Sequence, residues 1–143
     1  MAKYRGIGTL IKRGNGDGPP ETFTTIAGAR DVAGPALTRE IIDVTSQESS
    51  GDYAEKMPGP MDAGKVTFAL FWNPAGATHD EHTGLVADFN AGVARSYQLY
   101  YPDAGHKTCT FEAFVTSFAP TGEVKGMLTA AVELDITGVP NWS

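Results

Sequence analysis

Hydrophobic and polar residues alternate along two stretches in the C-terminal third of the chain. Apolar residues occupy every second position from 128 to 136, and a similar alternation runs from 108 to 118. Alternation over this length predicts β-strands that bury one face. The residues expected to face inward are Cys109, Phe111, Ala113, Val115 and Ser117 in the earlier stretch and Leu128, Ala130, Val132, Leu134 and Ile136 in the later one. We expect these two strands to form the spine of a β-sheet.

The outward face of the earlier strand is itself partly apolar. It carries Phe114 and Phe118, which predicts that this strand is covered on both sides. Turn-forming residues then interrupt the alternation at Ala119-Pro120-Thr121-Gly122. The two strands should therefore form a hairpin that turns within this segment.

Shorter stretches of the chain predict additional strands. Apolar residues indicate strands at 4–12, 22–28, 37–45, 65–72 and 94–101, whereas 29–35 looks irregular. Glycine and proline crowd the stretch 14–20, which predicts a hairpin turn. A phosphate-binding loop would need a helix directly after it, and the double proline at 19–20 excludes that arrangement.

One segment, 83–92, has the pattern of an α-helix. Thr83 can cap its start, and Gly92 can end it in a left-handed conformation. Leu85, Val86 and Phe89 share a face, which should lie across the sheet. Because 143 residues is the length of one domain, we predict a single mainly β domain over 1–143. Its architecture should be a β-sandwich or barrel-like fold with one flanking helix.

The stretch 46–63 is the least core-like part of the chain and is expected to be a long loop. Loops of this length are uncommon in compact domains and are usually functional or disordered. Two interpretations are open, a solvated surface loop and an arm that orders against a neighbouring subunit. Large apolar side chains within the stretch favour the arm. The residues expected to contact another subunit are Glu48, Asp52, Tyr53, Glu55, Lys56, Met57 and Met61.

Composition narrows the possible functions. The chain has 11 basic and 17 acidic residues, and a net charge of -6 argues against tight binding of nucleic acid through phosphates. The single cysteine, Cys109, excludes an internal disulfide framework, and its place on an apolar strand face predicts an inert core thiol. No apolar run approaches the roughly 20 residues of a membrane-spanning helix. We expect a soluble protein that does not insert into membranes.

Two groups of residues invite a chemical interpretation. His79-Asp80-Glu81-His82 would suit a small zinc hydrolase, but no third histidine or cysteine lies nearby in sequence. The favoured interpretation is that 79–82 is a polar segment leading into the helix, with its acidic residues near the positive end of the helix dipole. His106 lies near Cys109, but a thiol that faces a core lacks the exposed, electropositive setting that activates it. We therefore expect no catalytic, metal or cofactor site.

The outward positions of the last strand are small, neutral or acidic. They include Thr129, Glu133 and Asp135. If several copies joined edge to edge, this face could line a passage, and an acidic lining would repel phosphate and let DNA slide. Closure into a ring would also cover sheet edges that a monomer leaves exposed. These three residues are our candidates for a lumen lining.

Four segments of the chain share their order and spacing with a known family. They are Met57–Val66, Tyr97–Asp103, Phe111–Phe118 and Ile136–Trp142. Along nearly its whole length the chain resembles the tail tube, or major tail, proteins of long, non-contractile-tailed bacteriophages, or the equivalent subunit of a gene-transfer particle. The resemblance implies a β-sandwich with one helix, six copies per ring, and rings stacked into a tube. It also implies that a sheet from each subunit joins a continuous inner β-barrel.

The resemblance also implies partners and a location. The partners would be the tape-measure, tail-tip and tail-terminator proteins, and DNA would pass through the lumen. The loop 46–63 would contact neighbouring subunits or rings. The protein would be made in the cytoplasm of the bacterial host, reside in the virion tail and have no enzymatic activity. Two other functions stay open, a tube subunit of a secretion apparatus and a stand-alone β-sandwich that binds a protein or glycan.

Overall fold

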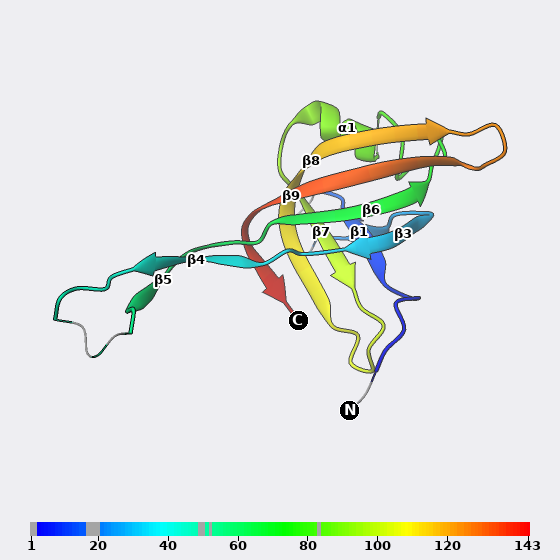
Figure 1. Ribbon diagram of the computed structural model, residues 1–143. Helices are drawn as coiled ribbons and strands as arrows, with labels where there is room; N and C mark the ends of the chain where they lie inside the picture. The colour runs from blue at the N-terminus through cyan, green and yellow to red at the C-terminus, as the bar shows by residue number, and fades with distance from the viewer. Residues whose placement is uncertain (1–2, 17–20, 49–50, 52, 83) are drawn as a thin grey trace.

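The computed structural model describes residues 3–16, 21–48, 51, 53–82 and 84–143. It consists of a seven-stranded antiparallel sheet in the order β2-β1-β7-β8-β9-β6-β3, a separate two-stranded sheet β4-β5, and one helix (Figure 1). The mainly β class with one helix is confirmed. The strands are β1 (Leu10–Gly14), β2 (Phe23–Thr25), β3 (Ala29–Ala33), β4 (Thr38–Asp43), β5 (Lys56–Asp62), β6 (Lys65–Phe71), β7 (Arg95–Tyr100), β8 (Thr108–Gly122) and β9 (Leu128–Trp142), and the helix is α1 (Leu85–Ala91).

Two long strands, β8 and β9, form the centre of the large sheet, as the alternation predicted. The two strands pair with each other. The first part of β8 also pairs with β7, and β9 also pairs with β6. Both strands bend along their length, so the sheet curls into two layers without closing into a barrel (Figure 1). In β9 the bend coincides with Gly138, whose φ of +80° suits glycine, and with a break in register against β8 between Thr110 and Glu112.

The core lies between the two layers and confirms most of the predicted inward residues. Ser117 is only half-buried, and Leu128 at the start of β9 is exposed. The buried apolar residues include Ile11, Val66, Phe68, Leu70, Tyr97, Leu99, Cys109, Phe111, Ala113, Val115, Ala130, Val132, Leu134 and Ile136.

The prediction that β8 is covered on both faces is wrong. Phe114 is exposed, whereas Phe118 packs against the core and meets Trp72 edge to face at 5.8 Å between ring centroids. The reason is a register shift between Val115 and Ser117, where β8 carries one more residue than β9. An extra residue reverses the alternation beyond it, so Phe118 turns inward.

The predicted turn at 119–122 is also wrong, because β8 continues to Gly122, which pairs with Leu128. The turn occupies 123–127. Pro120 is tolerated within the strand because β7 pairs only with Thr108–Ala113, which leaves this half of β8 at a sheet edge. At an edge, the N–H that proline lacks is not needed by a neighbouring strand.

Several element boundaries differ from those expected. The strand expected at 4–12 begins only at Leu10, and the stretch expected to be irregular at 29–35 contains β3. Asp31 at φ +52° and a register shift between Arg30 and Ala33 break the alternation that would have identified β3. The turn predicted at 14–20 does join paired strands, β1 and β2, although residues 17–20 lie outside the described part of the chain.

Helix α1 lies against β8 (Figure 1). Gly92 ends it at φ +65°, as predicted, while Gly84 holds the N-cap position and the predicted cap, Thr83, lies outside the described residues. The predicted apolar stripe is only partly correct. Leu85 is fully buried, but Phe89 is exposed and the acidic Asp88 is buried instead. Among the described residues, no helix has the length and apolar character needed to cross a membrane.

Candidate functional site

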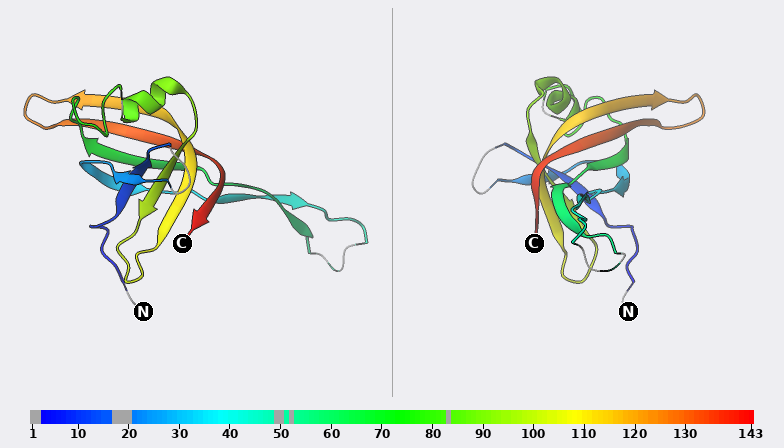
Figure 2. Two further views of the ribbon diagram at one scale, coloured as in Figure 1. Left: turned by 180° about the vertical axis from the view of Figure 1, so that it is seen from behind. Right: turned by 60° about the vertical axis from the view of Figure 1, so that its left-hand side comes forward.

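The stretch predicted to be a long loop is largely a β-hairpin arm, which we define as residues 38–62. Its second half, 56–62, forms β5 and pairs with β4 from Asp43↔Lys56 to Thr38↔Asp62. The arm projects away from the curled sheet, starting from its root at Thr38 and Asp62 (Figures 1 and 2). The prediction of a loop is correct for the described residues between 46 and 55 and wrong for 56–62, which form β5.

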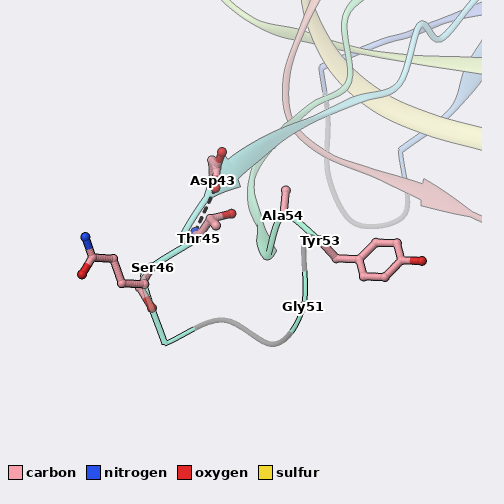
Figure 3. A pocket seen from close by; sticks show the side chains of 7 residues that line it. Asp43, Thr45, Ser46, Gly51, Tyr53 and Ala54 are labelled. Carbon is pink, nitrogen blue, oxygen red and sulfur yellow. Dashed lines mark hydrogen bonds between the residues drawn. The ribbon is translucent and has the colours of Figure 1, made fainter.

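The tip of the arm is held by short hydrogen bonds. The Val44 N–H donates to the Glu55 carbonyl at 2.9 Å, and the Glu55 N–H donates to the Thr45 hydroxyl at 2.8 Å. The Thr45 N–H donates to Asp43 Oδ1 at 2.9 Å, and these contacts from Thr45 hold the pKa of Asp43 below its usual value. Figure 3 shows the Tyr53 ring pointing away from Asp43 and Thr45. These hydrogen bonds link the ends of the two arm strands next to the connection, and the Tyr53 ring points outward from it.

Apolar side chains are exposed along the arm. Every residue of β4 is exposed, and so are all residues of β5 except the half-buried Gly59. Tyr53 is 83% exposed and Met61 is 69% exposed. A two-stranded hairpin is at best marginally stable in water, so exposed apolar residues on such an element indicate a surface that another molecule covers. The other exposed apolar residues of the arm are Ile41, Ile42, Val44 and Met57.

The structure brings most of the residues expected at a subunit contact onto the arm. Met57 and Met61 lie on β5, with Lys56 at its start. Glu48, Tyr53 and Glu55 are exposed on the connection between the arm strands, and Asp52 lies outside the described residues.

The residues expected to line a lumen lie on the outward face of β9. Thr129, Glu133 and Asp135 are half-buried and alternate with the buried Val132 and Leu134.

A lysine from the neighbouring strand modifies the charge of that face. Lys65 Nζ lies 2.5 Å from Glu133 Oε1, and Lys65 pairs with Asp135 across β6 and β9. The hydrogen bond to Glu133 raises the pKa of the exposed Lys65 ammonium. The outward face is therefore not uniformly acidic, because Lys65 offsets part of the negative charge.

Sequence reasoning missed a buried ionic cluster that joins α1 to the sheet. Arg13 from β1 donates from Nε to Asp88 Oδ2 at 2.6 Å and from Nη2 to Oδ1 at 2.7 Å. Arg95 from β7 places Nε 2.7 Å from Oδ1, and the Tyr97 hydroxyl donates to Oδ2 at 2.7 Å. The hydrogen bond to Asp88 raises the pKa of Arg13, and burial beside the carboxylate raises that of Tyr97. The cluster fixes a short helix to two strands.

The sequence does carry a signal for this cluster. Arg13 shares a strand face with the buried Ile11, and Asp88 lies one turn after the buried Leu85. Charged residues on otherwise apolar faces are costly unless they are paired, so opposite charges on two such faces indicate a contact between them.

The histidines and the cysteine lie in different environments. His79 is buried, accepts a hydrogen bond at Nδ1 from the Asn73 N–H at 3.0 Å, and places Nε2 2.6 Å from the Ala27 carbonyl. His82 is exposed beside Glu81. Within the described ranges, no group of three or more potential ligands could hold a metal ion. Cys109 is fully buried, and burial raises the pKa of its thiol.

The fold and these surfaces define a class of protein, an open β-sheet subunit with a projecting arm whose exposed faces suit association with other chains. The chain belongs to the family described as Lambda phage tail tube protein, TTP, whose model matches residues 11–143. Among curated protein sequences, none matches this chain.

Two solved structures have a similar fold. A chain in the virion of a native gene transfer agent particle matches with a TM-score of 0.76 and 24% identity, over 99% of each chain. A chain in the tail of an empty gene transfer agent particle, computed with helical refinement and C6 symmetry, matches with a TM-score of 0.75 and 24% identity, again over 99% of each chain. The fold of this chain is thus shared with proteins of particle tails.

Proposed function

We propose that this protein is a structural subunit of a virion tail tube, in which six copies form a ring and the rings stack around a lumen that carries DNA. Family membership supports the tube role, and the C6 symmetry of the similar tail supports a ring of six. The observation that carries the proposal is the arm, a projecting pair of strands with exposed apolar residues on both of them. Such an element gains stability only when another subunit covers it.

The free edges of the large sheet suit ring formation. The sheet is open, and its outermost strands are β2 and β3. An exposed edge strand offers unpaired N–H and C=O groups to another chain, and closure into a ring satisfies them. Edge-to-edge pairing of six such sheets would form a continuous wall.

The outward face of β9 is the proposed lumen lining. Thr129, Glu133 and Asp135 lie on it, and Lys65 reduces its negative charge. A face with few unpaired cations does not hold phosphate, so DNA would slide past it. Within the virion the further partners would be the tape-measure, tail-tip and tail-terminator proteins. A gene-transfer particle is the alternative setting for the same subunit.

Electron microscopy of the concentrated protein tests the arm directly. The variant Met57→Ser with Met61→Ser removes two exposed apolar side chains from β5, and Val93→Ser removes a comparable exposed side chain from the body. We expect the control to form rings and tubes and the arm variant to remain monomeric and folded, as judged by size exclusion and circular dichroism. Deletion of Glu48–Glu55 should have the same effect as the arm variant. Tubes from the arm variant at the same protein concentration as the control would refute the role of the arm.

A further inference from the structure

An apolar groove lies at the root of the arm. It has a volume of about 490 Å³ and lies between the base of the arm and the C-terminal part of β9. Val139 is 87% exposed and the Trp142 indole, stacked on Tyr101 at 6.2 Å between ring centroids, is 44% exposed. The lining includes Leu37, Met61 and Asp62 at the base of the arm and Val139, Pro140 and Trp142 from β9. Its apolar lining and exposed indole indicate a site that another protein surface covers.

The turn between β8 and β9 is the second unexplained apolar feature. We define the hairpin tip as residues 123–127. Val124 is fully exposed and Met127 is 66% exposed, although solvated turns usually consist of small polar residues. The Gly126 N–H donates to the Glu123 carbonyl at 3.2 Å, so the tip is a hydrogen-bonded turn. An ordered turn that exposes a valine and a methionine can insert these side chains into an apolar site on another molecule.

The groove and the hairpin tip lie at opposite ends of the molecule. β9 starts at Leu128, directly after the tip, and ends at Trp142 in the groove. The hairpin tip and the arm project in opposite directions in both the front and the rear views (Figures 1 and 2). Two different apolar surfaces at opposite ends allow head-to-tail contact between identical copies, and such contacts generate rings or filaments.

Charge favours the hairpin tip over the arm tip as the occupant. Asp62 is the charged residue in the groove lining. The arm tip, residues 43–56, carries Asp43, Glu48, Asp52 and Glu55 against the single Lys56, so the negative charge of Asp62 repels it. The hairpin tip carries Lys125 and Glu123 and has no net charge. Lys125 can therefore approach Asp62 while the apolar side chains enter the groove.

We propose that the hairpin tip of one copy docks in the arm-root groove of a second copy, with Val124 against Val139 and Lys125 near Asp62. The proposal rests on the proposed function, because it names the contact by which tube subunits join. In this contact the apolar hairpin tip is the inserted element, and the exposed end of β9 is part of the surface that receives it.

Cysteine cross-linking tests this contact. The variant Val124→Cys with Val139→Cys carries one thiol at each end of the molecule, so a link between them joins two copies. Val124→Cys with Val93→Cys is the matched control, and the native Cys109 is buried in β8 and does not compete. Assembled tubes, verified by negative-stain microscopy, are treated with a short bis-maleimide and run on a denaturing gel. We expect a ladder of covalent multimers from the first variant and mostly single chains from the control.

The outcomes separate this proposal from the proposed function. Tubes that form but give no ladder overturn the docking contact and leave the tube role intact. Protein that never assembles overturns both. A second variant, Val124→Asp, changes a fully exposed side chain and so leaves the monomer folded. It should raise the concentration needed for assembly about tenfold or more, because an aspartate cannot enter an apolar groove without losing hydration. Val93→Asp should change that concentration little, and equal effects of the two substitutions would refute the contact.

Discussion

Replacement of Asp88 by Asn tests whether the buried ionic cluster holds the helix to the sheet. The side chain of Asp88 is 3% exposed and contacts Arg13, Arg95 and Tyr97. Asparagine has nearly the same shape but carries no charge and presents an N–H₂ group where a carboxylate oxygen accepted hydrogen bonds. The substitution therefore leaves two arginines near each other without their counter-charge.

The burial of the cluster determines how much unfolding free energy the substitution should remove. Removal of one partner from a buried ion pair costs about 3–5 kcal/mol, because the remaining charge is left unpaired. The Arg13 and Arg95 side chains are 14% and 25% exposed, so water recovers part of this cost. We expect Asp88→Asn to lower the free energy of unfolding by about 3 kcal/mol, at the lower end of that range. A seven-residue helix is too short to be stable alone, so α1 should detach before the sheet unfolds.

Urea denaturation of the monomeric protein measures this effect, with size exclusion at the same concentration to verify the monomer. Asp31→Asn is the matched control, because it makes the same chemical change at an exposed position. Hydrogen exchange should show the largest loss of protection at 85–91. A loss of less than about 1 kcal/mol relative to the control would refute the reasoning, since that is the size of an exposed ion pair.

Three further predictions concern the core. Leu134→Ala removes a fully buried side chain from β9 and should lower the free energy of unfolding by about 2–5 kcal/mol; a smaller loss would mean that this strand is not central. Burial and the Asp88 carboxylate raise the pKa of Tyr97, so its stabilising contribution is present below about pH 10 and is lost as the pH rises further. The unfolding free energy of Tyr97→Phe should therefore fall less between about pH 9 and about pH 11 than that of the parent, and parallel curves would contradict this. The Cys109 thiol, whose pKa burial raises, should react with a thiol reagent only as fast as the protein unfolds, and rapid labelling of native protein would contradict its buried position.

The alternation of apolar residues was sufficient to locate the spine of the fold. It identified β8 and β9 and most of their inward residues, because one buried face imposes a period of two on the sequence. It could not locate the register shift between Val115 and Ser117. One extra residue leaves no local signal, and its effect on Phe118 depends on the facing strand.

The sequence predicted a segment that contacts other subunits at this place in the chain, but it did not predict that part of the segment is a strand. Pro58, Gly59 and Pro60 are strand breakers in most contexts, so the sequence indicated a loop. They are accommodated in β5 because this strand pairs with β4 alone, and its other edge needs no N–H donors. A local pattern cannot distinguish an isolated two-stranded arm from an irregular loop.

The buried ionic cluster was not predicted for a different reason. Its members come from β1, α1 and β7, and Arg13 and Asp88 are 75 positions apart in the chain. Each charge lies on a face that also carries a buried apolar residue, but one element alone does not show which other element supplies the opposite charge. Only the packing of the helix against the sheet brings the charges together.

Electron microscopy of the purified, concentrated chain shows whether identical subunits close around a lumen. We expect rings with a central bore that stack into tubes, in which β-strands of adjacent subunits meet edge to edge. A protein that stays monomeric at high concentration, or an assembly that lacks a bore and joins its subunits through α1 alone, would contradict it.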